Sequence, residues 1–167
     1  ITQLSGIASI ESGDGNDTVT GSSGNDLIIG GTGNDVLSGG AGNDTYAFSR
    51  GDGADTIKEN DLTTGNSDVI QFLGDISAEQ IWLRHVGNNL ELSVIGTGDK
   101  LTIKDWYLDD SHHVELFKTA DNKTLDDDNV ENLVLAMSSF APPPAGELVL
   151  LGTYHDTLAS LIATEWI

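Results

Sequence analysis

The sequence is dominated by the nonapeptide SGDGNDTVT (residues 12–20), which is followed without a gap by GSSGNDLII (21–29), GGTGNDVLS (30–38) and GGAGNDTYA (39–47). Every copy has glycine at the fourth position, asparagine at the fifth and aspartate at the sixth. The sixth-position aspartates are Asp17, Asp26, Asp35 and Asp44. The eighth position is always apolar: Val19, Ile28, Leu37 and Tyr46. Such regularity brings a carboxylate to the same point of each copy.

The repeat predicts very short strands that alternate with tight turns. Glycines at the first, second and fourth positions permit backbone angles that are closed to other residues. The three residues after the aspartate form one short strand, whose eighth-position side chain points inward. One nonapeptide cannot bury a core alone, so neighbouring copies must stack. A coil of two nonapeptides then places Asp17 over Asp35 and Asp26 over Asp44.

The stacked turns also predict a cation site. Successive carbonyl groups alternate in direction, so those of the first and third positions face one neighbouring turn, and those of the second and fourth face the other. Two carboxylates and roughly four carbonyl oxygens make an all-oxygen cage, which suits calcium with its roughly 6–8 oxygen ligands. Magnesium is disfavoured because it keeps several of its waters.

The pattern resembles the RTX repeat, Gly-Gly-x-Gly-x-Asp-x-apolar-x, of the haemolysin-type calcium-binding family, whose parallel β-roll binds calcium. Four consecutive copies in one phase make the resemblance specific. Ser12, Ser22 and Ser23 depart from the pattern but are small enough to allow a turn. The expected fold is mainly all-β: a parallel β-roll (β-solenoid) of nonapeptide repeats, extended and capped by further strands and one or two C-terminal helices.

Two weaker copies follow the regular block. Residues 51–57, GDGADTI, place Asp55 out of phase with Asp44, which lengthens the intervening strand at residues 45–49. Residues 65–70, GNSDVI, place Asp68 where it closes the last site together with Glu59 and Asp61. The alternative for Glu59 and Asp61 is a solvated loop.

The predicted metal ligands are side-chain carboxylates and turn residues. The carboxylates are Asp17, Asp26, Asp35, Asp44 and Asp55, joined by Asp61 and Asp68 at the end of the roll. The turn residues are Gly13, Asp14, Gly15, Gly24, Gly30, Gly31, Thr32, Gly33, Gly39, Gly40, Ala41, Gly42, Gly51 and Gly53. Together they predict several bound Ca²⁺ ions, about two to five by the number of stacked turn pairs.

The composition agrees with a cation-binding chain. With 27 acidic and 7 basic residues, the formal net charge is −20, so the chain repels itself unless cations join it. Nucleic acid is an improbable partner because phosphate binding needs a basic patch. The absence of cysteine excludes disulfides and thiolate metal sites, and calcium would serve as the staple instead.

The chain reads as a piece cut from a longer protein. It starts at Ile1, and residues 7–11 already look like the interior of a roll. No N-terminal signal peptide and no membrane-spanning apolar run of about 18 residues is evident.

After residue 69 the nine-residue repeat is no longer recognisable, but further strands are expected. Strands are predicted at 69–73, 81–86, 90–94, 101–106 and 114–117, with glycine-rich turns between them. This order resembles the calcium-binding-related segment that often follows RTX repeats. These strands are expected to extend and cap the roll.

Two helices are predicted near the end. Asp126 to Asn129 supply capping side chains, and Val130, Leu133, Val134 and Met137 follow at helical spacing. Residues 141–146, APPPAG, stop this helix and form a stiff linker. A second helix is expected from Thr153 or Asp156 to near Trp166, with Tyr154, Leu158, Leu161 and Ile162 on its apolar face.

The C-terminal stretch resembles the ends of very large RTX proteins, in which the last segment is the uncleaved signal for a type I secretion machine. The alternative is a helix that packs on the roll as an end cap, and the two are compatible. The resulting division is 1–68 for the calcium-binding RTX β-roll, 69–125 for the β-rich extension or cap, 126–140 for the capping helix, 141–147 for the Pro-rich linker and 148–167 for the helical secretion-signal segment.

No catalytic residue is expected. There is no Gly-x-Ser-x-Gly elbow, no His-Glu-x-x-His helix and no Walker loop. A zinc site at His112 and His113 is disfavoured, because adjacent residues of a strand point to opposite faces.

The resemblance implies a secreted, extracellular or cell-surface location and a calcium-binding module that folds on binding Ca²⁺ after export. Its partners would be calcium, the type I secretion machinery and upstream domains of the same protein; the pattern leaves the oligomeric state open. The alternatives are an adhesin module that binds carbohydrate or another surface, and the appended C-terminal module of an exported lipase, protease or alginate epimerase.

Overall fold

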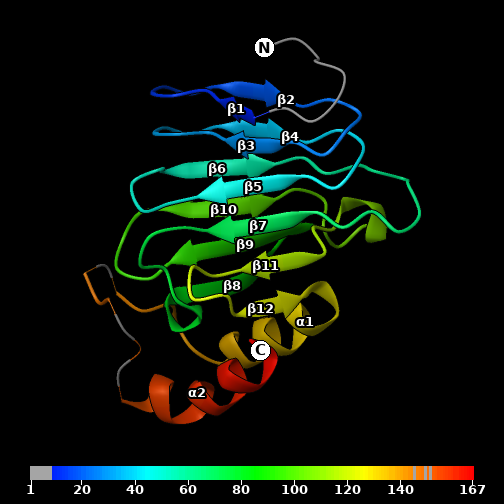
Figure 1. Ribbon diagram of the computed structural model, residues 1–167. Helices are drawn as coiled ribbons and strands as arrows, with labels where there is room; N and C mark the ends of the chain where they lie inside the picture. Colours follow the sequence, from blue (N-terminus) through cyan, green and yellow to red (C-terminus); the bar gives the residue numbers. More distant parts are fainter. Residues whose placement is uncertain (1–8, 145, 149, 151) are drawn as a thin grey trace.

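The computed structural model describes residues 9–144, 146–148, 150 and 152–167. Ile7 and Ala8 of the expected first strand, Ala145 of the linker, and Val149 and Leu151 lie outside the described residues. The described chain forms two six-stranded sheets, with two helices at one end (Figure 1).

Consecutive strands of the repeat block enter opposite sheets. One sheet has the order β1 (Ser9–Glu11), β3 (Leu27–Ile29), β5 (Thr45–Phe48), β7 (Val69–Phe72), β11 (Leu116–Lys118) and β12 (Thr124–Asp126). The other has the order β2 (Thr18–Thr20), β4 (Val36–Ser38), β6 (Ala54–Ile57), β10 (Lys100–Ile103), β9 (Asn89–Val94) and β8 (Ile81–Val86). Neighbouring strands of one sheet within the repeats are therefore parallel and two repeats apart, as predicted.

The apolar core lies between the two sheets. Along each short strand the middle residue is buried and its neighbours are more exposed, because successive side chains point to opposite faces. The four eighth-position residues are at most 2 % exposed. β5 has four residues where β2, β3 and β4 have three, so the predicted lengthening of this strand is confirmed.

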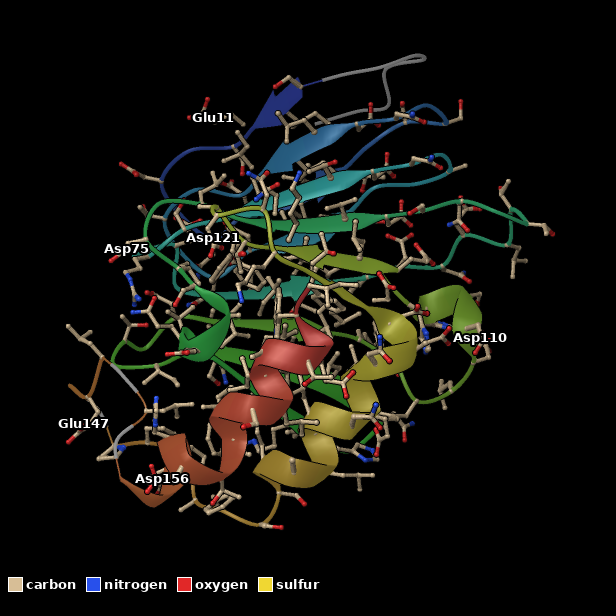
Figure 2. The ribbon with its side chains drawn as sticks, turned by 60° about the horizontal axis from the view of Figure 1, so that its bottom comes forward. Glu11, Asp75, Asp110, Asp121, Glu147 and Asp156 are labelled. Atoms are coloured by element: carbon tan, nitrogen blue, oxygen red, sulfur yellow. The ribbon has the colours of Figure 1, made fainter. Side chains whose placement is uncertain are left out.

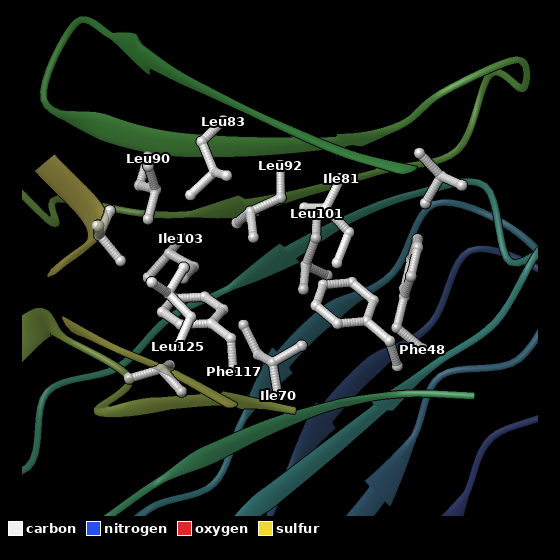
Figure 3. Packing of buried hydrophobic residues seen from close by; sticks show 14 of the residues in the cluster. Phe48, Ile70, Ile81, Leu83, Leu90, Leu92, Leu101, Ile103, Phe117 and Leu125 are labelled. Carbon is white, nitrogen blue, oxygen red and sulfur yellow. The ribbon is translucent and has the colours of Figure 1, made fainter. Parts of the chain in front are cut away.

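Beyond the repeats, the sheets continue with larger side chains and antiparallel pairing. β10 joins β6 in parallel, and β9 and β8 then follow antiparallel. Phe117, Leu125 and Ile103 fill the space between the sheets (Figure 3). β12 was not predicted, and the strand expected at 101–106 stops at Ile103, where Asp105 turns the chain with φ of 61°.

Two short 3₁₀ helices complete this part: η1 (Ala78–Gln80) and η2 (Asp110–His112). The interpretation of His112 and His113 as strand residues is therefore wrong. His112 ends η2, and the ring of His113 stacks on Trp106 at 3.9 Å between centroids.

Both predicted helices are present. α1 (Asp127–Met137) buries Val130, Leu133, Val134 and Met137, the four residues expected on its apolar face. α2 (Thr153–Glu165) buries Leu158 and Ile162, and Trp166 just beyond it is also buried. α2 contacts α1 and β12, so the C-terminal segment is packed against the end of the sheets (Figure 1). Neither described helix is long and apolar enough to cross a membrane.

Candidate metal centre

The glycines of the turns serve two different physical needs. Except for Gly24, those at the second and fourth positions take positive φ, for example 87° at Gly31 and 142° at Gly33, which other residues rarely adopt. Gly30 and Gly39, at the first position, do not. An added Cβ at Gly30 would lie 2.5 Å from Oδ2 of Asp35 and would displace that carboxylate, and one at Gly39 would lie 2.7 Å from Cβ of Asp44, so glycine at the first position leaves space for the aspartate. The prediction of unusual backbone angles at the first position is therefore wrong for these two residues.

The turn carbonyls alternate in direction as predicted. The carbonyl oxygen of Gly30 accepts a 2.6 Å hydrogen bond from Ser12 Oγ, and that of Thr32 accepts a 2.8 Å bond from Gly15 N–H, both in the preceding turn of the same edge. The carbonyl of Gly33 instead accepts from Ala54 N–H at 3.2 Å, in the following turn. Oxygens from adjacent turns thus face each other.

The sixth-position aspartates form two columns, one along each edge of the stacked turns. In the first column, Asp17 N–H donates to Asp35 Oδ1 at 2.8 Å, and Asp35 N–H donates to Asp55 Oδ1 at 2.9 Å. In the second column, Asp26 N–H donates to Asp44 Oδ1 at 2.8 Å, and Asp44 N–H to Asp68 Oδ1 at 2.7 Å. The predicted stacking of Asp17 on Asp35 and of Asp26 on Asp44 is present, and Asp55 and Asp68 continue it.

The columns carry buried negative charge. Asp35 and Asp44 are each 1 % exposed. Within the described part of the chain, the Oδ2 atoms of Asp17, Asp35 and Asp44 are buried without a hydrogen-bond partner, and these three side chains form no ion pair with Lys, Arg or His. Burying an unpaired charge is costly. The donor set therefore fits a hard cation that would bind these oxygens.

Proton affinity reflects the same burial. Burial raises the pKa of Asp44 to about 6, with Asp26 and Asp61 adding to the rise against the backbone hydrogen bond from Asp26. Burial likewise raises the pKa of Asp55 to about 7 and that of Asp68 to about 7. A proton and a metal cation are thus alternative ways of neutralising these carboxylates.

The loop between β6 and β7 turns inward at the end of the second column. Glu59 is 2 % exposed and accepts a 2.6 Å hydrogen bond from the Tyr46 hydroxyl, which in turn accepts from Gly39 N–H at 2.6 Å. Burial raises the pKa of Glu59 to about 8. The interpretation of Glu59 as part of a solvated loop is therefore wrong.

Asp61 also contacts the repeat block. It accepts from Gly42 N–H at 3.1 Å and from Thr63 N–H at 2.8 Å. Burial alone would raise its pKa, but hydrogen bonds from Thr63 and Gly42 outweigh it and leave the pKa below the ordinary value. Asp61 thus lies at the end of the second column, as the sequence suggested, in an environment that favours its ionised form.

The second repeat has a different turn. Ser22 stands at the second position, where the other copies have glycine; its N–H donates to Asp26 Oδ2 at 2.5 Å, and its Oγ accepts from Gly24 N–H at 3.1 Å. Gly24 lacks the positive φ of the other fourth-position glycines. The second repeat therefore forms its turn as predicted, with the Ser22 side chain accepting a backbone hydrogen bond within it. A ligand role for Gly24, as for the other turn residues, stays a prediction.

Two residues at the ends of the columns escaped the sequence pattern. Asp99 accepts from Gly51 N–H at 2.9 Å and from Gly53 N–H at 3.2 Å, so it closes the first column. Glu115 accepts from Asp68 N–H at 2.6 Å, in the second column. Glu115 comes directly before the strand β11, just as Asp17, Asp26, Asp35 and Asp44 come directly before their strands. This position was the signal in the sequence that could have identified Glu115.

Among the described residues, no group of three or more His, Asp or Glu side chains is arranged to hold a metal ion. The columns instead bring the aspartates of neighbouring turns together in pairs, each joined by a backbone N–H to carboxylate hydrogen bond.

Comparison with known families agrees with this geometry. Residues 11–46 match the RTX calcium-binding nonapeptide repeat in four copies, and residues 89–129 match the haemolysin-type calcium binding protein related domain. The repeat block of this chain is thus similar to the RTX, haemolysin-type calcium-binding repeats. A similar protein is the iron-regulated protein FrpA of Neisseria meningitidis serogroup C, 34 % identical over 92 residues, which are 53 % of this chain and 8 % of FrpA. The chain therefore spans less than a tenth of that relative's length.

Proposed function

We propose that this chain is a calcium-binding module whose repeat block is a parallel β-roll that folds when Ca²⁺ binds. The observation that carries the proposal is the pair of aspartate columns, in which the buried Oδ2 atoms of Asp17, Asp35 and Asp44 have no hydrogen-bond partner and no basic side chain among the described residues. Calcium suits such sites because it accepts several oxygen ligands in flexible geometry. The sixth-position aspartates and the turn carbonyls of neighbouring copies are its ligands.

The mechanism we propose is folding coupled to binding. At a formal net charge of −20, the calcium-free chain resists compaction. Each bound ion neutralises stacked aspartates, so its binding free energy contributes to folding free energy. The larger apolar core beyond the repeats, around Phe117 and Leu125, gives the turns a surface on which to stack.

We further propose that the module is the C-terminal part of a larger protein that leaves the cell by type I secretion. Cytosolic calcium is scarce, so the chain would stay loose until it reached an extracellular concentration of roughly 10⁻⁴ to 10⁻³ M, the range of extracellular calcium modules. Supporting this are the RTX match and a relative much longer than the aligned segment. The division 1–68, 69–125, 126–140, 141–147 and 148–167 belongs to this proposal, with the last segment both secretion signal and end cap.

The experiment is a calcium titration followed by circular dichroism and by hydrodynamic radius. The expected result is a gain in β signal and a smaller radius as Ca²⁺ reaches the millimolar range, reversed by EGTA. Magnesium at the same concentration is the control and should have little effect. A chain that is equally folded and compact in EGTA would count against the proposal.

A further inference from the structure

The second column continues beyond the repeats into the segment that follows them. β5 pairs with β7 so that Thr45 lies opposite Val69, and β7 pairs with β11 so that Val69 lies opposite Leu116. The residues that precede these strands therefore lie in line. Glu115 occupies the place that a further sixth-position aspartate would take after Asp44 and Asp68.

The backbone contacts at this step repeat those of the column. Val69 N–H donates to the carbonyl of Asp44 at 2.8 Å, and Leu116 N–H donates to the carbonyl of Asp68 at 3.0 Å. Asp44 N–H reaches the carboxylate of Asp68 at 2.7 Å, and Asp68 N–H reaches that of Glu115 at 2.6 Å. Glu115 thus makes the contact that defines a member of the column.

The first column has no such continuation. Among the described residues, β10 places the apolar Leu101 opposite Asp55, in the position that Glu115 takes opposite Asp68 in the second column, and Asp99 lies two residues before Leu101. Continuation by a carboxylate is therefore a property of the second column and not of every strand that follows the repeats.

A cavity of about 870 Å³ adjoins this end of the second column. Asp61, Asn66, Glu115 and Asp127 are among the residues that line it, and Trp106 lies in its wall. Asp68 is 0 % exposed, and its Oδ2 accepts a 3.3 Å hydrogen bond from the amide of Asn66, in the loop that lines the cavity. One step earlier in the column, the buried Oδ2 of Asp44 has no partner within the described residues. Both ring nitrogens of the nearby His113 have hydrogen-bond partners: Nδ1 contacts the carboxylate of Asp127 at 3.0 Å, and Nε2 contacts the carbonyl oxygen of Trp106 at 3.1 Å.

We propose that the second column ends in a further divalent-cation site, held by the carboxylates of Asp68 and Glu115 and open to this cavity. Like the repeat sites it has two carboxylates, with carbonyl groups and water from the cavity completing the shell, so it needs no cluster of three acidic side chains. It rests on the proposed calcium-binding function, but no nonapeptide contributes Glu115. The site couples the repeat block to β11 and thereby to the end that α1 and α2 cover.

The test uses terbium, an oxygen-seeking stand-in for calcium, whose emission is sensitised by a nearby tryptophan. Trp106 lines the cavity, so an ion at Glu115 should be reported by tryptophan excitation. Glu115→Gln keeps an oxygen for the N–H of Asp68 but removes the charge. Glu131→Gln is the matched control, because Glu131 lines the same cavity and is exposed.

The expected result is that Glu115→Gln loses most of the tryptophan-excited emission and binds fewer calcium ions per chain in calorimetry, whereas Glu131→Gln behaves as the wild type. Emission and stoichiometry that are unchanged in Glu115→Gln, or reduced equally in both variants, would overturn the site. If Glu115→Gln does not fold, diffraction from wild-type crystals soaked in terbium decides: a peak between Asp68 and Glu115 supports the site, and its absence there overturns it.

The same series separates this site from the repeat sites. A wild-type chain that binds no calcium would overturn the repeat sites and this site together. If Asp35→Asn loses ions while Glu115→Gln keeps the wild-type number and emission, the repeat sites stand and the Glu115 site alone is wrong.

Discussion

The backbone N–H of Asp44 donates a 2.7 Å hydrogen bond to the carboxylate of Asp68, which lies 24 residues further along the chain. The equivalent bond from Asp26 to Asp44 spans 18 residues, and that from Asp35 to Asp55 spans 20. The contact is nearly constant although the spacing changes, because parallel strand pairing fixes the register and lets loops of different length lie outside it. The columns therefore depend on the pairing of the strands, and a change to either should alter the affinity for calcium.

Asp35 should be the most sensitive carboxylate. Its position between Asp17 and Asp55 lets it serve two stacked turn pairs. Asp35→Ala should raise the calcium concentration at the folding midpoint by about tenfold or more, since charge count sets calcium affinity. Circular dichroism during a calcium titration measures this midpoint.

The matched control for that prediction is Asp156→Asn, which removes a charge from the exposed surface of α2 (Figure 2). It should leave the midpoint near that of the wild type. Equal shifts in the two variants would mean that total charge, and not the column, governs folding.

Gly39→Ala tests whether first-position glycines are required for space. The added Cβ would lie 2.7 Å from Cβ of Asp44 and closer still to its carboxylate, whose Oδ1 is held by Asp26 N–H. We expect a loss of about 1–3 kcal/mol in the free energy of unfolding, measured by urea in saturating calcium. Gly98→Ala is the control because nothing lies within 4 Å of its added Cβ; a Gly39 variant as stable as the Gly98 variant would refute the account of this position.

Tyr46→Phe should weaken the connection between the repeats and the inward-turned loop. Loss of the hydroxyl leaves the N–H of Gly39 and the buried carboxyl of Glu59 without their shared partner. Leaving buried polar groups unsatisfied costs about 1–3 kcal/mol, measurable by urea unfolding. Tyr107→Phe, whose hydroxyl contacts the exposed Glu131 at 3.2 Å, should cost clearly less. Similar losses would show that the buried bridge has no special role.

The calcium-free fold should be more stable in mild acid than in base. Burial raises the pKa of Asp55 from 3.8 to about 7 and that of Glu59 from 4.5 to about 8. Groups with a pKa raised by folding stabilise the fold fully below their unfolded pKa, and this stabilisation is lost as pH rises through the folded pKa. In EGTA, the folded fraction measured by circular dichroism should therefore fall from about pH 5 to about pH 8, where the calcium-free chain is largely unfolded. Constant or rising stability over this interval would contradict the assignment.

Calcium binding should show the opposite dependence. Ligand carboxylates must lose their protons before they bind a metal, so affinity should rise over the same pH interval. Calorimetry in buffers of different ionisation enthalpy would count the protons released. Proton release is expected on the acid side of this interval, where the calcium-free chain still folds with protonated carboxylates, and binding there without proton release would contradict the raised pKa values of Asp55 and Asp68.

The nine-residue beat was sufficient to predict the alternation of strands between sheets, the burial of Val19 and Leu37, and the vertical order of the aspartates, because all of these follow from local periodicity. It did not reveal the contacts of Glu115 or Asp99, which depend on strand pairing between distant segments. The repeat also led to the wrong reason for glycine at position 39, which was expected to serve unusual backbone angles. The steric conflict with the Asp44 carboxylate arises only in the folded turn. Such nonlocal contacts carry no periodic signal.

The most direct measurement is anomalous diffraction from crystals grown in millimolar calcium, the concentration range of extracellular calcium modules. The account predicts calcium between stacked turns, beside the paired carboxylates of Asp17 with Asp35, Asp35 with Asp55, and Asp26 with Asp44. Anomalous maps without a peak at any of these pairs would contradict it.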